Sequence, residues 1–249
     1  MVEENRVVSG FTGVNLATLG NLQIQLGDQE GLRIEAEDNL IPYLDTVVSG
    51  DQLVIRSQDG IALRPTRPVN FYLTAKSLDS IALTGSGNIV APDLKADQFR
   101  ARLSGSGNMT LGNLYATNIE MHLTGSGNLR AAGATAQDQQ ITLSGSGDVE
   151  LGNWNAEMAE VRITGSGGFD ASKGAVKAQS VTLSGSGEYH ADGVDSATTE
   201  ARIMGSGSMT VRVRDRLSAQ ITGSGSVRYA GSPQVQTTTT GSGRVRPID

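Results

Sequence analysis

Short runs of alternating apolar and polar residues fill most of the chain, and these runs recur at a fixed distance. The recurrence is marked by the tripeptide Gly-Ser-Gly, whose first residue is Gly85, Gly105, Gly125, Gly145, Gly165, Gly185, Gly205, Gly223 and Gly241. The spacing between successive copies is 20 residues six times and then 18 residues twice. A fixed period near 20 residues is typical of solenoid proteins, in which each repeat forms one coil.

Each repeat contains three apolar pairs, at positions −4 and −2, +4 and +6, and +9 and +11 from the first glycine. In the repeat of Gly145 these are Ile141 and Leu143, Val149 and Leu151, and Trp154 and Ala156. Two residues is the side-chain period of a β-strand, so each pair indicates a short strand with one face turned inward. Turn-forming residues such as Gly152 and Asn153 separate the second pair from the third.

Three strands and three corners per repeat predict an all-β fold, a right-handed parallel β-helix with about 20 residues per coil. Parallel crossovers are almost always right-handed, and a left-handed hexapeptide helix would need apolar residues every six positions. Residues 81–249 form the β-helix of nine GSG-marked coils in this interpretation. Residues 1–80 form an irregular N-terminal β region that continues into the helix and caps it, since bare strand edges invite aggregation.

One coil is concealed before the first Gly-Ser-Gly. If Gly20 stands for the second glycine of the motif, Val14 and Leu16 fall at −4 and −2, and Leu22 and Ile24 fall at +4 and +6. The alignment therefore predicts that residues near 14–24 already form a coil of the solenoid.

The nine tripeptides hold 18 of the 32 glycines. Glycine inside a strand costs about 0.5–1 kcal/mol relative to alanine, so this many copies indicates a backbone requirement. Alternation points both glycines of each copy inward at a corner, where a Cβ would collide, and points the serine outward. We expect the serines to form a structural corner ladder and not a ligand site: Ser86, Ser106, Ser126, Ser146, Ser166, Ser186, Ser206, Ser224 and Ser242.

The tripeptide does not match the glycine motifs of known chemistry. Phosphate-binding loops need a following helix and, in one class, a lysine, and the nucleophile elbow has a different spacing. Calcium-binding β-rolls place an aspartate in nine-residue steps, and only Asp148 stands at a comparable position. We therefore expect no cofactor, no metal site and no catalytic residue here.

Few other residues suggest catalysis or ligand binding. The chain has no cysteine and two histidines, His122 and His190, which the pattern places outward on different strands. Trp154 is expected in the core. A ladder of Asn88, Asn108 and Asn128 at +3 gives way to other residues in later repeats. The acidic residues fall on outward corners, and nothing in the sequence gathers them in one groove.

Charge separates the two ends of the chain. The net charge is −6, but residues 1–60 carry 3 basic and 10 acidic groups, whereas residues 200–249 carry 7 basic and 3 acidic groups. The basic end has one aromatic residue, Tyr229, which is a weak signature for nucleic acid, so nucleic-acid binding is not expected. No run of 18 apolar residues occurs and the first residues are acidic and mixed. We expect no membrane insertion and no export signal within this sequence.

The stretch from Arg6 to Val48, with SGFTGV and EDNLIPYLDT, followed by repeated L-[TS]-G-S-G, resembles the bacterial putative auto-transporter adhesin head domain, or GIN domain. The resemblance extends to about Val245. It implies a β-helix in an exported, envelope-associated protein, located at the cell surface, in the periplasm or secreted. Adhesion is the function proposed for that family, and the resemblance supplies no catalytic or ligand residues.

The function hypothesis is a non-enzymatic structural or adhesive surface module that presents its faces to an unidentified protein or glycan. The first alternative is a scaffold that associates with further copies of itself, since the two ends carry opposite charge. A weaker alternative is a carbohydrate-active enzyme built on the β-helix, which would need two carboxylates in one groove.

Overall fold

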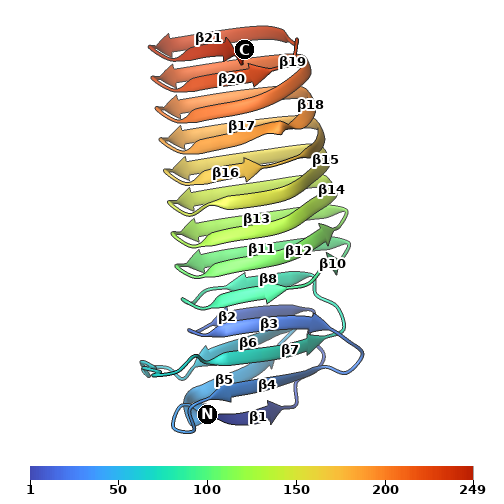
Figure 1. The fold of residues 1–249 in the computed structure, drawn as a ribbon, viewed down its shortest axis with the longest axis vertical. Coiled ribbons are helices and arrows are strands. Elements are labelled where there is room, and N and C mark those ends of the chain that lie inside the picture. Colours follow the sequence, from blue (N-terminus) through green and yellow to red (C-terminus); the bar gives the residue numbers. More distant parts are fainter. Residues whose placement is uncertain (249) are drawn as a thin grey trace.

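Stacked parallel strands build most of the protein, and the computed structural model describes residues 1–248. The strands form an elongated β-solenoid whose N-terminal and C-terminal segments lie at opposite ends of the long axis (Figure 1). The repeated part consists of β8 (Ser80–Leu83), β9 (Asn88–Ala91), β10 (Leu94–Lys95), β11 (Gln98–Gly105), β12 (Asn108–Tyr115), β13 (Asn118–Gly125), β14 (Asn128–Gly145), β15 (Val149–Gly165), β16 (Gly168–Ala171), β17 (Gly174–Gly185), β18 (Glu188–Gly205), β19 (Ser208–Gly223), β20 (Ser226–Ala230), β21 (Gln234–Gly241) and β22 (Arg244–Pro247).

The register confirms the coil predicted from the repeat. Met121 pairs with Ala101 below it and with Ile141 above it, each 20 residues away, and all these pairings are parallel. In the last coils the step falls to 18 residues, as between Ile221 and Thr239. The three short strands expected in each coil are joined in β14, β15, β18 and β19, which run for 16 to 18 residues. In those coils only the Gly-Ser-Gly corner interrupts the ladder.

The predicted apolar pairs line the interior. Ile141, Leu143, Val149 and Leu151 are at most 1% exposed, and Trp154 is fully buried as expected. The second member of the third pair, such as Ala156, is only partly buried and packs against the core from its margin.

The two glycines of each corner meet different constraints. The first adopts a positive φ, for example 113° at Gly125, a conformation that side-chain-bearing residues rarely take. The second is buried against the coil below, so a Cβ on Gly187 would lie 2.6 Å from the carbonyl oxygen of Gly167 and 2.9 Å from Ile163 Cγ2. Both glycines are therefore required by the close approach of successive backbones.

Backbone hydrogen bonds join the corners of neighbouring coils. The Gly125 carbonyl oxygen accepts from the Ser146 N–H at 3.0 Å and from the Gly147 N–H at 3.1 Å. The same pattern recurs in the next coil, where Ser166 N–H donates to the Gly145 carbonyl at 2.9 Å. Each corner thus satisfies backbone donors of the coil above it.

A short segment of the interior is aromatic and polar. The Phe169 ring stacks on Tyr189 with centroids 5.0 Å apart and meets the edge of Trp154 at 5.1 Å. Trp154 Nε1 donates to Gln139 Oε1 at 2.8 Å, and the Tyr189 hydroxyl donates to Gln179 Oε1 at 2.5 Å. No buried side-chain nitrogen or oxygen in residues 1–248 lacks a hydrogen-bond partner. The buried polar groups are therefore compatible with the surrounding core.

The N-terminal region continues the stack and then reverses its strands. It contains β1 (Val2–Arg6), β2 (Gly13–Ala17), β3 (Asn21–Leu26), β4 (Gly31–Ala36), the short 3₁₀ turn η1 (Ile41–Tyr43), β5 (Leu44–Ser49), β6 (Gln52–Ser57) and β7 (Asn70–Ala75). Val14 and Leu16 pair with Ile81 and Leu83, so the concealed coil is present in the register predicted from Gly20. Below it lie β6 and β7, and the stack ends with the antiparallel strands β4, β5 and β1.

Arg6 occupies the space between the two last strands. Its guanidinium donates to the carbonyl oxygen of Leu44 at 2.5 Å and to that of Ile41 at 3.3 Å, and the side chain is 18% exposed. The N-terminal end of the core is thus partly covered by a side chain that satisfies otherwise free carbonyls.

We predict that Gly187→Ala lowers the free energy of unfolding by about 2 kcal/mol, the cost of inserting a methyl group into a packed site. Chemical denaturation followed by circular dichroism measures this. Ser186→Ala is the matched control, because this neighbouring side chain is exposed, and it should change stability by less than about 0.5 kcal/mol. Equal stability of the two variants would contradict the steric role of the second glycine.

Burial raises the pKa of Tyr189 well above its ordinary value of 10.0. The folded state therefore keeps this hydroxyl protonated where the unfolded chain ionises it. The stability that follows is present in full below about pH 10 and is lost as the pH rises through the folded pKa. Denaturant melts of the native protein from pH 9 to pH 11 should show a steeper loss of stability, by up to about 1.4 kcal/mol per pH unit, than melts of Tyr189→Phe. Identical slopes would contradict burial of the hydroxyl.

Candidate interaction faces

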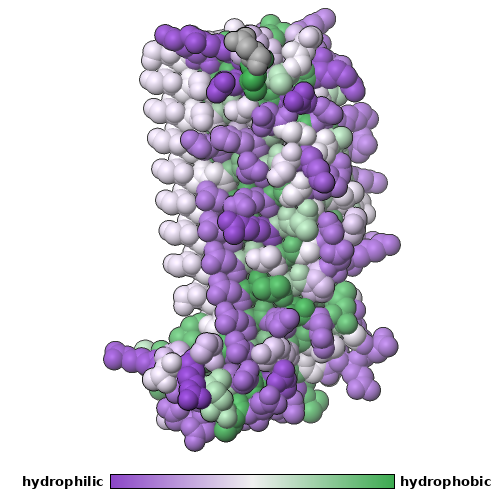
Figure 2. Space-filling view, in the orientation of Figure 1, coloured by the Kyte–Doolittle hydropathy of each residue, from purple (hydrophilic) through white to green (hydrophobic). Residues whose placement is uncertain are grey.

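One edge of the solenoid is a column of small uncharged side chains. It is formed by the corner serines and their neighbours, and Figure 2 shows it as a pale column running along most of the long axis. All nine serines are exposed, and they stack at successive coils. Ser224 and Ser242 are the one pair of these serines in residues 1–248 whose hydroxyls hydrogen bond, at 3.1 Å. The corner backbone is joined by its own hydrogen bonds, so a ladder of serine hydroxyls stays a prediction for the other coils.

A second column, of asparagine side chains, extends further than the sequence indicated. Asn128 donates to Asn108 at 3.4 Å, Asn108 to Asn88 at 3.2 Å, and Asn88 to Asn21 at 3.1 Å. Asn21 in turn donates to Asn70 at 3.1 Å, so the ladder includes the concealed coil and the one below it. In the upward direction the carboxylate of Asp148 takes over and accepts from the Gly168 N–H at 2.8 Å.

Acidic side chains from three coils meet above this ladder. Asp148, Glu150, Asp170, Glu188 and His190 line a shallow hollow of about 370 Å³. The expectation that no groove gathers acidic groups is therefore wrong, because stacking brings together residues that are 20 positions apart. Glu150 is already paired with Arg130, at 2.8 and 3.0 Å, and within residues 1–248 no group of side chains is placed to hold a metal ion.

The opposite face carries a groove of about 500 Å³ rich in hydrogen-bonding groups and arginine. Its lining includes Thr84, Arg100, Arg102, Ser104 and His122. Arg100 donates to Glu120 at 2.8 Å, and this hydrogen bond lowers the pKa of the Glu120 carboxyl. Arg102 has no carboxylate within 4.0 Å in the described part of the chain, so its charge is free to meet an anion.

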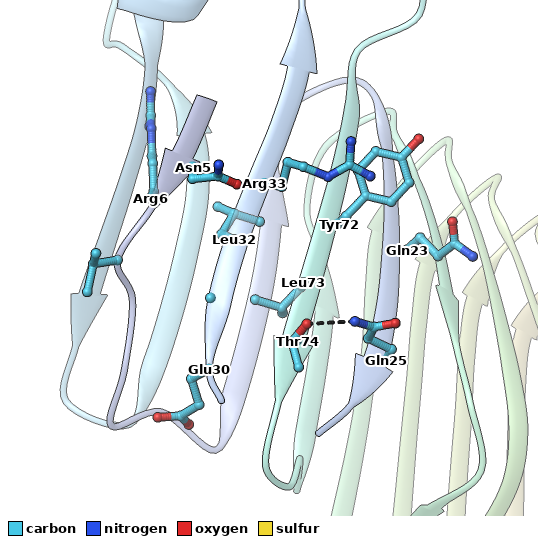
Figure 3. A pocket seen from close by; sticks show the side chains of 12 residues that line it. Asn5, Arg6, Gln23, Gln25, Glu30, Leu32, Arg33, Tyr72, Leu73 and Thr74 are labelled. Carbon is cyan, nitrogen blue, oxygen red and sulfur yellow. Dashed lines mark hydrogen bonds between the residues drawn. The ribbon is translucent and has the colours of Figure 1, made fainter. Parts of the chain in front are cut away.

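A third groove, of about 550 Å³, lies among β1, β3, β4 and β7 (Figure 3). The Arg33 guanidinium covers the Tyr72 ring, with its carbon 4.1 Å from the ring centre, and Arg33 Nη1 donates to Glu3 at 2.7 Å. Gln25 donates to Thr74 at 2.8 Å. The aromatic face is thus occupied by an arginine of the same chain and offers no open platform for a sugar ring.

The largest hollow, of about 740 Å³, lies where the coils become shorter. Eight residues separate Ala191 from Thr199, but only six separate the equivalent Val211 and Leu217, and the register shifts between them. The wider coils therefore overhang the narrower ones. Small apolar residues such as Ala156 and Val213 line the hollow, together with charged groups such as the Lys177–Glu157 pair at 3.1 Å.

The remaining predicted residues lie on the surface. The side chains of His122 and His190 are 36% and 45% exposed and face glutamates at 3.8 and 3.7 Å. The helical structure in residues 1–248 has neither the length nor the apolar character to cross a membrane. Sequence reasoning missed the buried column at −6, which contains Phe99, Ile119 and Gln139, because polar residues interrupt its apolar pattern.

Solved structures share the fold. A putative adhesin from Parabacteroides distasonis matches with a TM-score of 0.76 and 20% identity over 99% of this chain and 96% of that one. A putative adhesin from Parabacteroides merdae matches with a TM-score of 0.72 and 21% identity over 100% and 96%. A structure described as a putative lipid binding protein, from Parabacteroides distasonis, matches with a TM-score of 0.69 and 23% identity over 100% and 96%. At these identities the likeness concerns the fold alone.

Comparison with protein families agrees with the resemblance found in the sequence. No curated protein matches the sequence. The family described as "Putative auto-transporter adhesin, head GIN domain" matches residues 10–173 and 171–233, which together make up most of the solenoid and its cap. The chain belongs to this family of adhesin head domains.

Proposed function

We propose that the protein is a non-enzymatic adhesive module that acts at the cell surface and binds acidic glycans along the face of Arg102. The observation that carries the proposal is the groove of Arg100, Arg102 and His122, where hydroxyls of successive coils surround an arginine without a carboxylate partner. Saccharides are bound through hydrogen bonds to hydroxyls, and an acidic sugar adds a carboxylate or sulfate that a guanidinium can hold.

The regular stack supports an adhesive role. Equivalent side chains repeat about every 4.8 Å along the axis, so a rigid face can make many weak contacts with an extended polymer. Multivalent contact of this kind raises avidity without a deep pocket. Adhesion also requires exposure to the partner, so we place the protein outside the cytoplasm, in agreement with its family.

A carbohydrate-active enzyme is the second candidate, and the acidic hollow of Asp148, Glu150, Asp170 and Glu188 favours it. Glycoside hydrolysis needs one carboxyl held protonated and one ionised across the scissile bond. Asp148, Asp170 and Glu188 are exposed to solvent, and the hollow is shallow, so water is not excluded from the site. We therefore rank binding above catalysis.

We predict that the purified protein binds immobilised acidic polysaccharides and that Arg102→Ala weakens this binding about tenfold, equivalent to about 1.4 kcal/mol. Biolayer interferometry against acidic and neutral polysaccharide surfaces measures the effect. Arg162→Ala is the control, since Arg162 occupies the same position two or more coils away but is paired with Glu160 at 2.6 Å. Binding that stays at background on all surfaces, or equal losses in both variants, would overturn the proposal.

The enzymatic alternative makes a separate prediction. Incubation with the same polysaccharides should release no new reducing ends, because the hollow lacks a desolvated acid. Release that disappears in Asp170→Asn and persists in Arg102→Ala would instead establish catalysis at the acidic hollow.

A further inference from the structure

Both ends of the solenoid present strand edges without a partner in the described chain. At the C-terminal end β21 pairs only with β19, and β22 pairs only with β20. At the N-terminal end β5 pairs only with β6, and β1 pairs only with β4. Such edges expose backbone N–H and C=O groups that can pair with another strand.

The C-terminal end carries no cap within residues 1–248. Every residue of β21 is exposed, although Val235, Thr237 and Thr239 continue the inward columns of Leu217, Ala219 and Ile221. The end of the core is therefore covered only by one strand with short side chains. Figure 1 shows β21 and the C-terminus at the outermost level of the stack.

The charges of the two ends are complementary. Arg216, Arg228, Arg244 and Arg246 lie in the last coils, and within residues 1–248 none of them has a carboxylate within 4.0 Å. The other end carries Glu3 on β1 and Asp45 on β5, with further acidic residues in the loops between them. Contact between two copies of the same end would bring like charges together, whereas contact between unlike ends would not.

The strand order places the free edges of the two ends on matching faces. One face runs from β1 through β4, β7, β3 and β9 to β20 and β22. The other runs from β5 through β6, β2 and β8 to β19 and β21. A second copy moved along the long axis thus sets its β1 above β22 and its β5 above β21.

We propose that copies of this protein associate head to tail, the C-terminal end of one on the N-terminal end of the next, so that both faces continue across the contact. Arg244 and Arg246 then lie on the outer side near Glu3, because Val245 and Glu4 occupy the inward register positions. Arg6 already occupies the Leu44 carbonyl, which leaves the edge of β1 and the remainder of β5 for pairing. Contact between unlike ends does not close on itself, so it propagates into open chains of copies.

Sedimentation velocity across a range of protein concentrations tests this association at low and high salt. The average mass should rise with concentration at low salt and fall as salt is added, because exposed charges are screened. Thr237→Lys with Thr239→Lys should keep the protein monomeric, since a second copy would bury two lysines. The control is Thr110→Lys with Gln140→Lys, which adds the same charge to exposed sites on the lateral faces and should associate as the native protein does.

Charge reversal separates a head-to-tail contact from other modes. Arg244→Glu with Arg246→Glu, and Glu3→Lys with Asp45→Lys, should each raise the dissociation constant at least about tenfold, and an equimolar mixture of the two should recover association. A monomer at every concentration would overturn the proposal. Complexes that stop at two copies, or a loss of association in the lateral control, would also overturn it, because they indicate a symmetric or sideways contact.

Discussion

The spacing between stacked backbones at the Gly-Ser-Gly corner is the constraint on which the rest of the structure depends. Hydrogen-bonded strands lie about 4.8 Å apart, and at the corner two chains turn together at this distance. The carbonyl oxygen of Gly167 lies where a side chain on Gly187 would begin, and Gly125 needs a positive φ to make the turn. Since every coil must turn at the same place, the two glycines recur in each of them.

The corner determines what the remaining positions can do. It aligns equivalent residues of successive coils, so that Asn88, Asn108 and Asn128 become a hydrogen-bonded ladder and Phe169 stacks on Tyr189. It also leaves the outward positions free of structural demands, and their side chains differ from coil to coil. The arginine groove, the acidic hollow and the charged ends all lie at such positions, which is why binding is more plausible on the faces than at the glycines.

Much of the fold could be predicted from the sequence, because the contacts are nearly all between residues one period apart. Adding 20 to a residue number locates its neighbour, and the concealed coil of Gly20 followed from the same rule. The antiparallel cap could not be predicted in this way, since β4 meets β7 and β1 at separations that no period describes. Gln139 and Gln179 were missed as core residues because their partners, Trp154 and Tyr189, lie on other strands. The acidic hollow had a signal that was available, since Glu150, Asp170 and His190 share position +5.

The most direct test of this account is to delete residues 105–124, one whole coil, and measure unfolding in denaturant together with the circular dichroism spectrum. Ser104 aligns with Thr124 and Gly105 with Gly125, so the deletion joins equivalent places in the stack. If the corner is the repeating constraint, the shortened protein keeps a β-rich spectrum and a single cooperative transition. Loss of cooperative unfolding would contradict the claim that each coil is a unit held by its glycine corner.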